Sequence, residues 1–235
     1  MVLFPFVKGH NGFEVNLTEH QWVEFGKALK SFHLAALPPG VTYSIRRETY
    51  SPKWREIVKS FLIRIDRETF TEQVARDLAS FLKTKRAETL ELIRRAERFA
   101  LVIQAQDPEF ILCHADIHVG NLLIDENDEL YIIDWDTLMF APKERDLMFV
   151  GGGLGGGGHT PQDEISLFYQ GYGQTNIDPI ALSYYRCERI IEDISIFCRQ
   201  IFLSDKGGKD REQAHDYLKS NYLPGATIEL TIGSI

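Results

Sequence analysis

Residues 110–125 read FILCHADIHVGNLLID, and residues 130–136, which follow closely, read LYIIDWD. Three short apolar runs within these stretches predict buried strands: 110–113, 122–124 and 130–133. The polar residues 125–129 predict a turn that folds the second run back against the third as a β-hairpin. Because a rigid scaffold often presents reactive side chains where strands run into loops, we expect the chemistry of this chain at these strand ends.

Polar side chains gather at the strand ends: His114, Asp116, His118 and Asn121 after the first strand, and Asp134 and Asp136 after the last. Asp116 and Asn121 share one short loop, and Asp134 should enter the same cleft from the neighbouring strand. Carboxylate and amide oxygens suit Mg²⁺, which commonly binds one or two carboxylates together with substrate phosphates. An aspartate that accepts a proton from a hydroxyl group would complete a phosphoryl-transfer site.

Some of these residues also have a plainer interpretation. Plain turn residues are expected at Asp125, Asp128 and Glu129. Asp116, Asn121 or Asp134 alone could be a cap or turn residue, but three such residues around one hairpin favour a functional site. Asp136 is equally consistent with a site role and with a helix or turn cap.

The pattern His114-x-Asp116-x4-Asn121, followed by Ile133-Asp134-Trp135-Asp136, resembles the catalytic core of the aminoglycoside phosphotransferase family, which has a protein-kinase-like fold. The resemblance implies that Asp116 is the catalytic base and that His114 braces the loop. It also implies that Asn121 and Asp134 hold Mg²⁺ and thereby contribute to nucleotide binding.

Two further residues belong to this resemblance. His118 stands where protein kinases usually carry a lysine, and the pattern HxDxHxxN is typical of small-molecule kinases. Asp146, within Glu144-Arg145-Asp146-Leu147, matches an aspartate that steadies the catalytic loop in the family. The specific motifs span residues 110–148, while the resemblance extends over roughly the whole chain.

The fold implied by the resemblance is α+β: a mainly helical C-terminal lobe with a small catalytic β-hairpin, the N-terminal nucleotide lobe being largely absent. Residues 1–12 would be the end of an N-lobe strand and the hinge, and residues 13–235 the C-terminal lobe with its catalytic core at 110–148. Within the first part, residues 1–8 predict a strand and residues 9–12 a loop.

In the resembled family, a segment like residues 3–9 touches adenine, which makes Phe6 a candidate nucleotide contact. A kinase of this type also needs a lobe that covers the phosphates and supplies a lysine and a glutamate. We therefore expect little or no turnover from these residues alone, because positioning of the phosphates supplies most of this catalysis. Three alternatives would explain the missing N-terminal lobe: the chain is a fragment, its start is wrongly assigned, or the protein is split into two chains.

Helices are predicted along the rest of the chain by apolar residues spaced three and four apart. Thr18-Glu19-His20-Gln21 is a capping box that opens a helix to about Ala36. Further helices are expected at 71–83, 87–106, 178–203 and 209–222, with another that starts at Thr160-Pro161. The segment 40–70 mixes aromatic and basic residues and is expected to be solvated surface, with a substrate or phosphate contact as the alternative. The tail 223–235 has some strand character.

The run Gly151-Gly-Gly-Leu-Gly-Gly-Gly-Gly158 does not predict a phosphate-binding loop. No lysine follows it as in GxxxxGK[ST], and it lies after the catalytic motifs, whereas the glycine-rich loop of a kinase lies before them. A flexible connector on the substrate side is the expected structure.

Composition limits the functional classes. The chain has 235 residues and a net charge of −8, so nucleic acid is not an expected partner, whereas a cationic small molecule is. The sequence contains no run of 18 apolar residues, so no membrane-spanning helix is expected. Free core thiols are expected at Cys113, Cys187 and Cys198, which favours a cytoplasmic location.

The function implied is ATP-dependent phosphorylation of a small-molecule hydroxyl group, of the aminoglycoside or aminocyclitol class. Residues 132–137 and 143–153 look most like the spectinomycin-modifying branch of the family. Alternatives are a non-catalytic binding remnant and a kinase of another metabolite, choline-like or homoserine-like. A metallophosphatase lacks its expected motifs here, and His118 disfavours a protein kinase. The sequence does not decide whether the phosphate donor is ATP or GTP. It also does not decide whether the role is antibiotic resistance or housekeeping metabolism.

Overall fold

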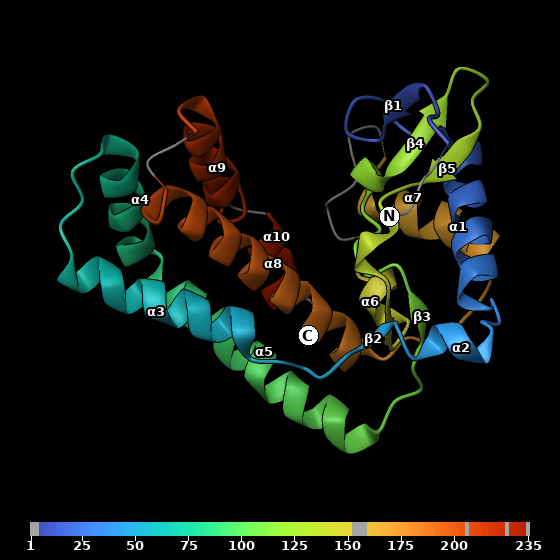
Figure 1. The fold of residues 1–235 in the computed structure, drawn as a ribbon, viewed down its shortest axis with the longest axis horizontal. Coiled ribbons are helices and arrows are strands. Elements are labelled where there is room, and N and C mark those ends of the chain that lie inside the picture. Colours follow the sequence, from blue (N-terminus) through green and yellow to red (C-terminus); the bar gives the residue numbers. More distant parts are fainter. Residues whose placement is uncertain (1–4, 152–158, 205–206, 224–225, 234–235) are drawn as a thin grey trace. The chain divides into compact units, whose positions relative to one another are not determined.

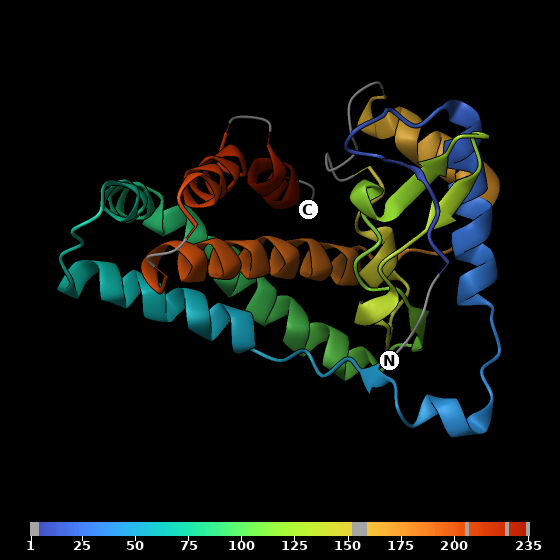
Figure 2. The same cartoon turned by 45° about the horizontal axis from the view of Figure 1, so that its top comes forward.

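The computed structural model describes residues 5–151, 159–204, 207–223 and 226–233. The chain divides into two compact units, each built from two separate stretches of sequence. The first unit comprises Met1–Glu48 and Pro108–Asp178, and the second comprises Thr49–Asp107 and Pro179–Ile235. Figures 1 and 2 show sheets and helices in the first unit and helices in the second.

Two small sheets in the first unit carry the sequence motifs of residues 110–136. One has the antiparallel order β1-β4-β5, with β1 at Gly9–Asn11, β4 at Leu122–Asp125 and β5 at Leu130–Ile132. The other has the order β2-β6-β3, with β2 at Arg46–Arg47, β6 at Met139–Ala141 and β3 at Ile111–Cys113. The predicted hairpin is confirmed, because Leu122 pairs with Ile132 and Ile124 with Leu130.

Three predictions about these strands are wrong. Gly9–Asn11 forms β1 rather than a loop, and residues 5–8 form no strand; residues 1–4 lie outside the described residues. A Cβ atom at Gly9 would lie 2.2 Å from the carbonyl oxygen of Ile124, so glycine permits the close pairing of β1 with β4. β5 is only partly buried, with Tyr131 exposed, because it is the edge strand of its sheet.

The helices of the first unit are α1 (Glu19–His33), α2 (Pro39–Thr42), α6 (Glu144–Leu147) and α7 (Pro161–Tyr172), together with 3₁₀ turns at Val119–Asn121 and Trp135–Thr137. The predicted capping box of α1 is confirmed: the Thr18 hydroxyl accepts from the Gln21 backbone N–H at 3.2 Å, and Gln21 Oε1 accepts from the Thr18 N–H at 2.9 Å. α7 begins at Pro161 as predicted, after a second capping box.

Helices α1 and α7 pack with their backbones in contact (Figure 1). A Cβ atom at Gly26 of α1 would lie 2.2 Å from the Phe168 carbonyl oxygen, and one at Gly171 of α7 would lie 1.9 Å from the Val23 carbonyl oxygen. Phe25 and Phe168 meet edge to face beside this crossing, with ring centroids 5.1 Å apart. The two glycines therefore let the helices approach more closely than any side chain would allow.

The second unit is helical in the residues that the structure describes. Its helices are α3 (Lys53–Arg67), α4 (Gln73–Thr84), α5 (Arg86–Gln106), α8 (Pro179–Phe202), α9 (Lys209–Ser220) and α10 (Thr227–Gly233). The long helix α8 packs along α3, α5 and α9 (Figures 1 and 2). No described helix of either unit is long and apolar enough to cross a membrane.

Helices α4, α5, α8 and α9 confirm the sequence predictions within a few residues. The prediction of solvated surface over residues 40–70 is wrong for α3, which buries Val58, Phe61, Leu62 and Ile65 on one face. Strand character in the tail is also wrong, since Thr227–Gly233 is the helix α10 and buries Ile228. The three cysteines are free and buried, as expected.

Candidate active site

The candidate site is built on the loop that joins β3 to β4, residues 114–121. This loop begins where β3 leaves its pairing with β6, Cys113 lying opposite Met139. Ala115, directly before Asp116, has φ 70°, a left-handed conformation that non-glycine residues rarely adopt. Neighbouring groups must therefore hold the loop in place at this point.

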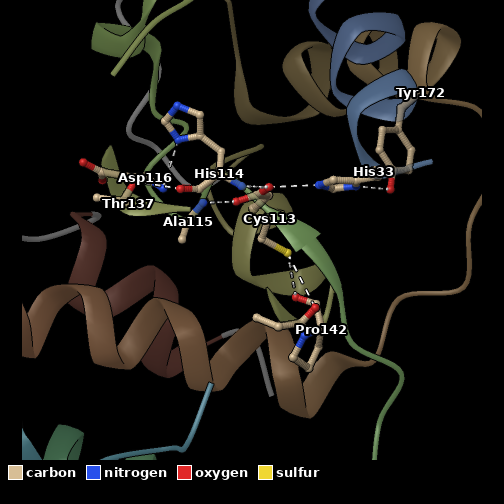
Figure 3. Close-up of polar contacts among 10 residues, drawn as sticks. His33, Cys113, His114, Ala115, Asp116, Thr137, Pro142 and Tyr172 are labelled. Atoms are coloured by element: carbon tan, nitrogen blue, oxygen red, sulfur yellow. Dashed lines mark hydrogen bonds and ion pairs between the residues drawn. The ribbon is translucent and has the colours of Figure 1, made fainter. Parts of the chain in front are cut away.

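Asp146 of α6 holds the loop at this point; Figure 3 shows the loop residues His114 and Ala115 that it binds. Its side chain is fully buried, and its two oxygens accept hydrogen bonds from consecutive loop amides: Oδ2 from the His114 N–H at 2.9 Å and Oδ1 from the Ala115 N–H at 2.7 Å. Hydrogen bonds to a charged acceptor are stronger than neutral ones. The contacts of Asp146 thus match the bracing role that the sequence resemblance implied.

The His114 side chain is buried and joins this loop to the chain after β5. Its Nε2 lies 2.9 Å from the Ile133 carbonyl oxygen, and its Nδ1 accepts from the Asp116 N–H at 3.3 Å. A carbonyl only accepts hydrogen bonds, so Nε2 carries the ring proton. The Thr137 hydroxyl also donates to the His114 carbonyl oxygen at 2.7 Å.

Asn121 and Asp134 lie next to the same connection. The Asn121 amide donates from Nδ2 to the Asp116 carbonyl oxygen at 2.7 Å, and the Asn121 carbonyl oxygen accepts from the Ile133 N–H at 2.9 Å. The peptide groups on either side of Ile133 are therefore tied to His114 and to Asn121. Asp134, the next residue, has φ 61° and an exposed side chain.

The surroundings of Asn121 and Asp134 suit a hard cation. Asp134 stands at the N-cap position of the 3₁₀ turn Trp135–Thr137, yet its side chain makes no capping hydrogen bond. The capping explanation therefore does not account for its strained backbone. Because the Asn121 NH₂ group is tied to Asp116, the Asn121 amide oxygen is the atom left to act as a ligand. One carboxylate and one amide oxygen fit the preference of Mg²⁺ for oxygen donors.

Asp116 itself is half-buried, and His118 lies beside it. His118 Nε2 is 3.8 Å from Asp116 Oδ2, and His118 Nδ1 accepts from the Gly120 N–H at 3.1 Å. The imidazole stacks on Phe13, with centroids 5.4 Å apart, and meets Phe149 edge-on at 6.0 Å. These contacts fix the ring next to the carboxylate of Asp116.

Three sequence predictions find less support in this geometry. Asp136 lies exposed inside the 3₁₀ turn rather than at its cap position. Phe6 is 92% exposed and lies before β1, so its assignment to adenine stays a prediction. The glycine run can be followed only at Gly151, since residues 152–158 lie outside the described residues.

A buried cluster behind the loop was not predicted as part of the site. Ligand atoms of His33, Cys113 and Asp146 all lie within 4.8 Å of one another, which is close enough for a metal ion. However, His33 Nε2 and both Asp146 oxygens are already hydrogen-bonded, and burial raises the pKa of the Cys113 thiol, which keeps it protonated. We interpret the cluster as a structural network.

Comparisons with known proteins agree with this site. A model of the phosphotransferase enzyme family matches residues 1–177. A spectinomycin phosphotransferase in complex with ADP and spectinomycin is 39% identical, with a TM-score of 0.89, over 98% of this chain and 70% of its own. Its AMP-bound complex is 40% identical, with a TM-score of 0.86, over 97% and 70% of the two chains.

A more distant neighbour shares the fold alone. An ethanolamine kinase from Plasmodium vivax is 15% identical, with a TM-score of 0.58, over 100% of this chain and 68% of its own. The α+β, protein-kinase-like fold that was expected from the sequence is confirmed by these matches.

Proposed function

Because the chain belongs to the phosphotransferase enzyme family, we propose that it transfers the γ-phosphoryl group of ATP to a hydroxyl group of spectinomycin or a similar cationic aminocyclitol. The similarity to a spectinomycin phosphotransferase supports this substrate class. The observation that carries the proposal is the loop after β3, in which the Asn121 amide is hydrogen-bonded to the backbone of Asp116 at 2.7 Å. A proton acceptor and a metal ligand are thus held on one fixed segment.

In the proposed reaction, Asp116 orients the acceptor hydroxyl group and takes its proton. The acceptor oxygen forms a bond to the γ-phosphorus while the bond from that phosphorus to the β-phosphate oxygen breaks, and ADP leaves. His118, 3.8 Å from Asp116, limits the movement of the base. Residues 1–12, including Phe6, are proposed as the hinge that contacts the nucleotide base.

Asn121 and Asp134 would hold Mg²⁺. When bound, the ion would neutralise negative charge on the β- and γ-phosphates. What the protein itself contributes is the rigid placement of the two ligands, because His114 and Asn121 bind the peptide groups on either side of Ile133. Rigid positioning of this kind is how such enzymes lower the barrier.

The base assignment is tested with Asp116→Asn, which keeps the shape of the side chain but removes the proton acceptor. In a full-length version that also carries the N-terminal nucleotide lobe, phosphorylated spectinomycin, measured by mass spectrometry, should form about 10²- to 10⁴-fold more slowly, the usual contribution of a general base. Asp128→Asn, in the exposed turn between β4 and β5, is the matched control and should stay within about twofold of the unchanged chain, as is usual for a surface substitution. Retention of activity within about tenfold by Asp116→Asn would contradict the assignment.

The metal assignment is tested by calorimetric titration with ATP in the presence and absence of Mg²⁺. We expect magnesium-dependent binding, which Asp134→Ala should weaken by about tenfold or more, as loss of a metal-site residue commonly does. A folded chain that binds ATP equally well with and without Mg²⁺ would exclude Asn121 and Asp134 as ligands. An acceptor panel of spectinomycin, kanamycin, choline and homoserine would separate the proposed substrate class from other small metabolites.

A further inference from the structure

The cluster behind the catalytic loop extends beyond Asp146 to two residues on other helices. His33, the last residue of α1, places Nε2 2.9 Å from Asp146 Oδ2. On the other side of the ring, His33 Nδ1 lies 2.8 Å from the hydroxyl of Tyr172, the last residue of α7. All three side chains are buried. Figure 3 shows His33 between Tyr172 and the loop residues His114 and Ala115.

We propose that Tyr172 and His33 are positioning residues for the catalytic base: Tyr172 fixes the tautomer of His33, and His33 fixes the Asp146 carboxylate that holds the loop before Asp116. The inference rests on the proposed function only in taking Asp116 as the base. Neither Tyr172 nor His33 touches the reacting groups, so both act through Asp146.

The direction of each hydrogen bond follows from the partners. Backbone N–H groups can only donate, so both oxygens of Asp146 accept from the loop. An ionised carboxylate has no proton to give, so His33 Nε2 must donate to it. The proposed arrangement places the one imidazole proton on Nε2, so Nδ1 has a lone pair, which accepts the Tyr172 proton. Burial raises the pKa of Tyr172 above its usual range, which keeps the hydroxyl protonated as a donor.

This arrangement matters at Ala115, where the backbone is left-handed. The Ala115 N–H is bound to Asp146 Oδ1, so any rotation of the carboxylate releases the strained residue next to the base. Without His33, Asp146 would be a buried carboxylate with one donor fewer, and its orientation would be set by the two amides alone. A fixed carboxylate therefore requires a fixed His33 proton.

The packing of α1 against α7 delivers the Tyr172 hydroxyl. Gly171 precedes Tyr172 and lies against the α1 backbone, where a Cβ atom would approach the Val23 carbonyl oxygen to 1.9 Å. The Tyr172 ring also stacks on Phe168, with centroids 5.3 Å apart. The close packing of the two helices therefore fixes the position of the Tyr172 hydroxyl.

The first test reads the proton position directly. The ring ¹⁵N signals of His33 in the full chain should show a neutral imidazole with its proton on Nε2. A proton on Nδ1 would mean that Tyr172 accepts instead of donating, which would overturn the proposal.

The second test reads the loop by amide hydrogen exchange. Tyr172→Phe removes the donor and keeps the ring, and we expect the His114 and Ala115 amides to exchange about five- to tenfold faster, the effect of losing about one hydrogen bond. Tyr169→Phe is the matched control, since it removes a hydroxyl from the same helix that is not the one bonded to His33. Equal exchange at both amides in the two variants would refute the proposal that Tyr172 acts on the loop through His33 and Asp146.

Conservative replacements of His33 show whether its hydrogen bond to Asp146 matters or only the volume of its side chain. The Gln amide can replace the Nε2 donor to Asp146, whereas the Asn amide can replace only the Nδ1 side. His33→Gln should therefore keep the two amides more protected than His33→Asn does; the opposite order would overturn the proposal. These measurements need neither nucleotide nor turnover. The positioning role of Tyr172 and His33 can therefore be refuted or supported independently of the phosphotransfer assay.

Discussion

At the scale of single residues, the candidate site is marked by backbone strain away from ordinary turns. Ala115 and Asp134 are non-glycine residues with positive φ on the two segments that meet at the site. By contrast, Asp128, also at positive φ, lies in the β4–β5 turn, where such a conformation is common. Strain that no turn explains is typical of functional positions, which supports the roles proposed for this loop.

The residues that carry the chemistry could be predicted because they stand close together in sequence. Asp116, Asn121 and Asp134 fall within one motif-bearing stretch of the chain. His33 could not be found in this way, since its bond to Asp146 spans 113 residues and depends on how α1 crosses the loop. Tyr172 is harder still to find from the sequence, because its hydrogen-bond partner is His33, which belongs to no recognised motif.

Glu164 on α7 allows a prediction about pH. It is 2% exposed, its Oε2 is buried without a hydrogen-bond partner among the described residues, and burial raises its pKa above the ordinary value of 4.5. The folded chain therefore holds this proton more tightly than the unfolded chain. Its contribution to stability is fully present below pH 4.5 and is lost as the pH rises through the folded-state pKa.

Glu164→Gln removes this titration. We expect the variant to be more stable than the original chain by about 1 kcal/mol at pH 7, the lower end of the cost of an unpaired buried group, and to gain nothing at pH 4. Urea unfolding at both pH values measures the difference, with Glu129→Gln in the exposed turn as control. A gain of the same size at both pH values would show that packing, and not ionisation, is responsible.

At the scale of elements, sequence patterns located the helices whose apolar stripe is clear and missed those in which charge obscures it. α3 contains bases and acids throughout, so the stripe of Val58, Phe61 and Ile65 was interpreted as surface. β1 was missed for a different reason: a strand of Gly9, His10 and Asn11 has no β-forming side chain, and only its pairing with β4 holds it. Tertiary contacts decided both elements.

The α1–α7 crossing allows a prediction at the same scale. Gly171→Ala would place a Cβ atom 1.9 Å from the Val23 carbonyl oxygen, and backbone cannot give way as a side chain can. We expect a loss of about 2 kcal/mol, since overpacking costs about 3 kcal/mol and alanine returns about 1 kcal/mol of helix propensity.

Thermal or urea unfolding measures this loss. Gly40→Ala in α2 is the control, because a Cβ atom there has no neighbour within 4 Å. If the two variants are equally stable, the α1 backbone does not lie as close to Gly171 as the 1.9 Å approach to the Val23 carbonyl oxygen implies.

At the scale of the whole molecule, the path of the chain links the two units more firmly than a single linker would. Each unit combines two separate stretches, so the backbone passes between them after Glu48, Asp107 and Asp178. If the first unit unfolded alone, residues 108–178 would become a loop of about 70 residues closed by the second unit. Closing such a loop costs about 4 kcal/mol, which disfavours partly unfolded states and predicts one cooperative transition.

The three cysteines report on this prediction without any added probe. Cys113 lies in the first unit, while Cys187 and Cys198 lie in the second; all are at most 1% exposed. Burial raises the pKa of Cys187 to about 12 and those of the other two thiols well above their usual range, so labelling by a thiol reagent requires unfolding.

We expect the three sites to give the same free energy of opening when labelling is followed by peptide mass spectrometry over a urea series. Full labelling of all three in strong denaturant is the control for reactivity. Labelling of Cys113 at lower urea than Cys187 and Cys198 would show that the first unit opens by itself. In that case the catalytic loop would have a local stability of its own, and nucleotide should slow the labelling of Cys113 alone.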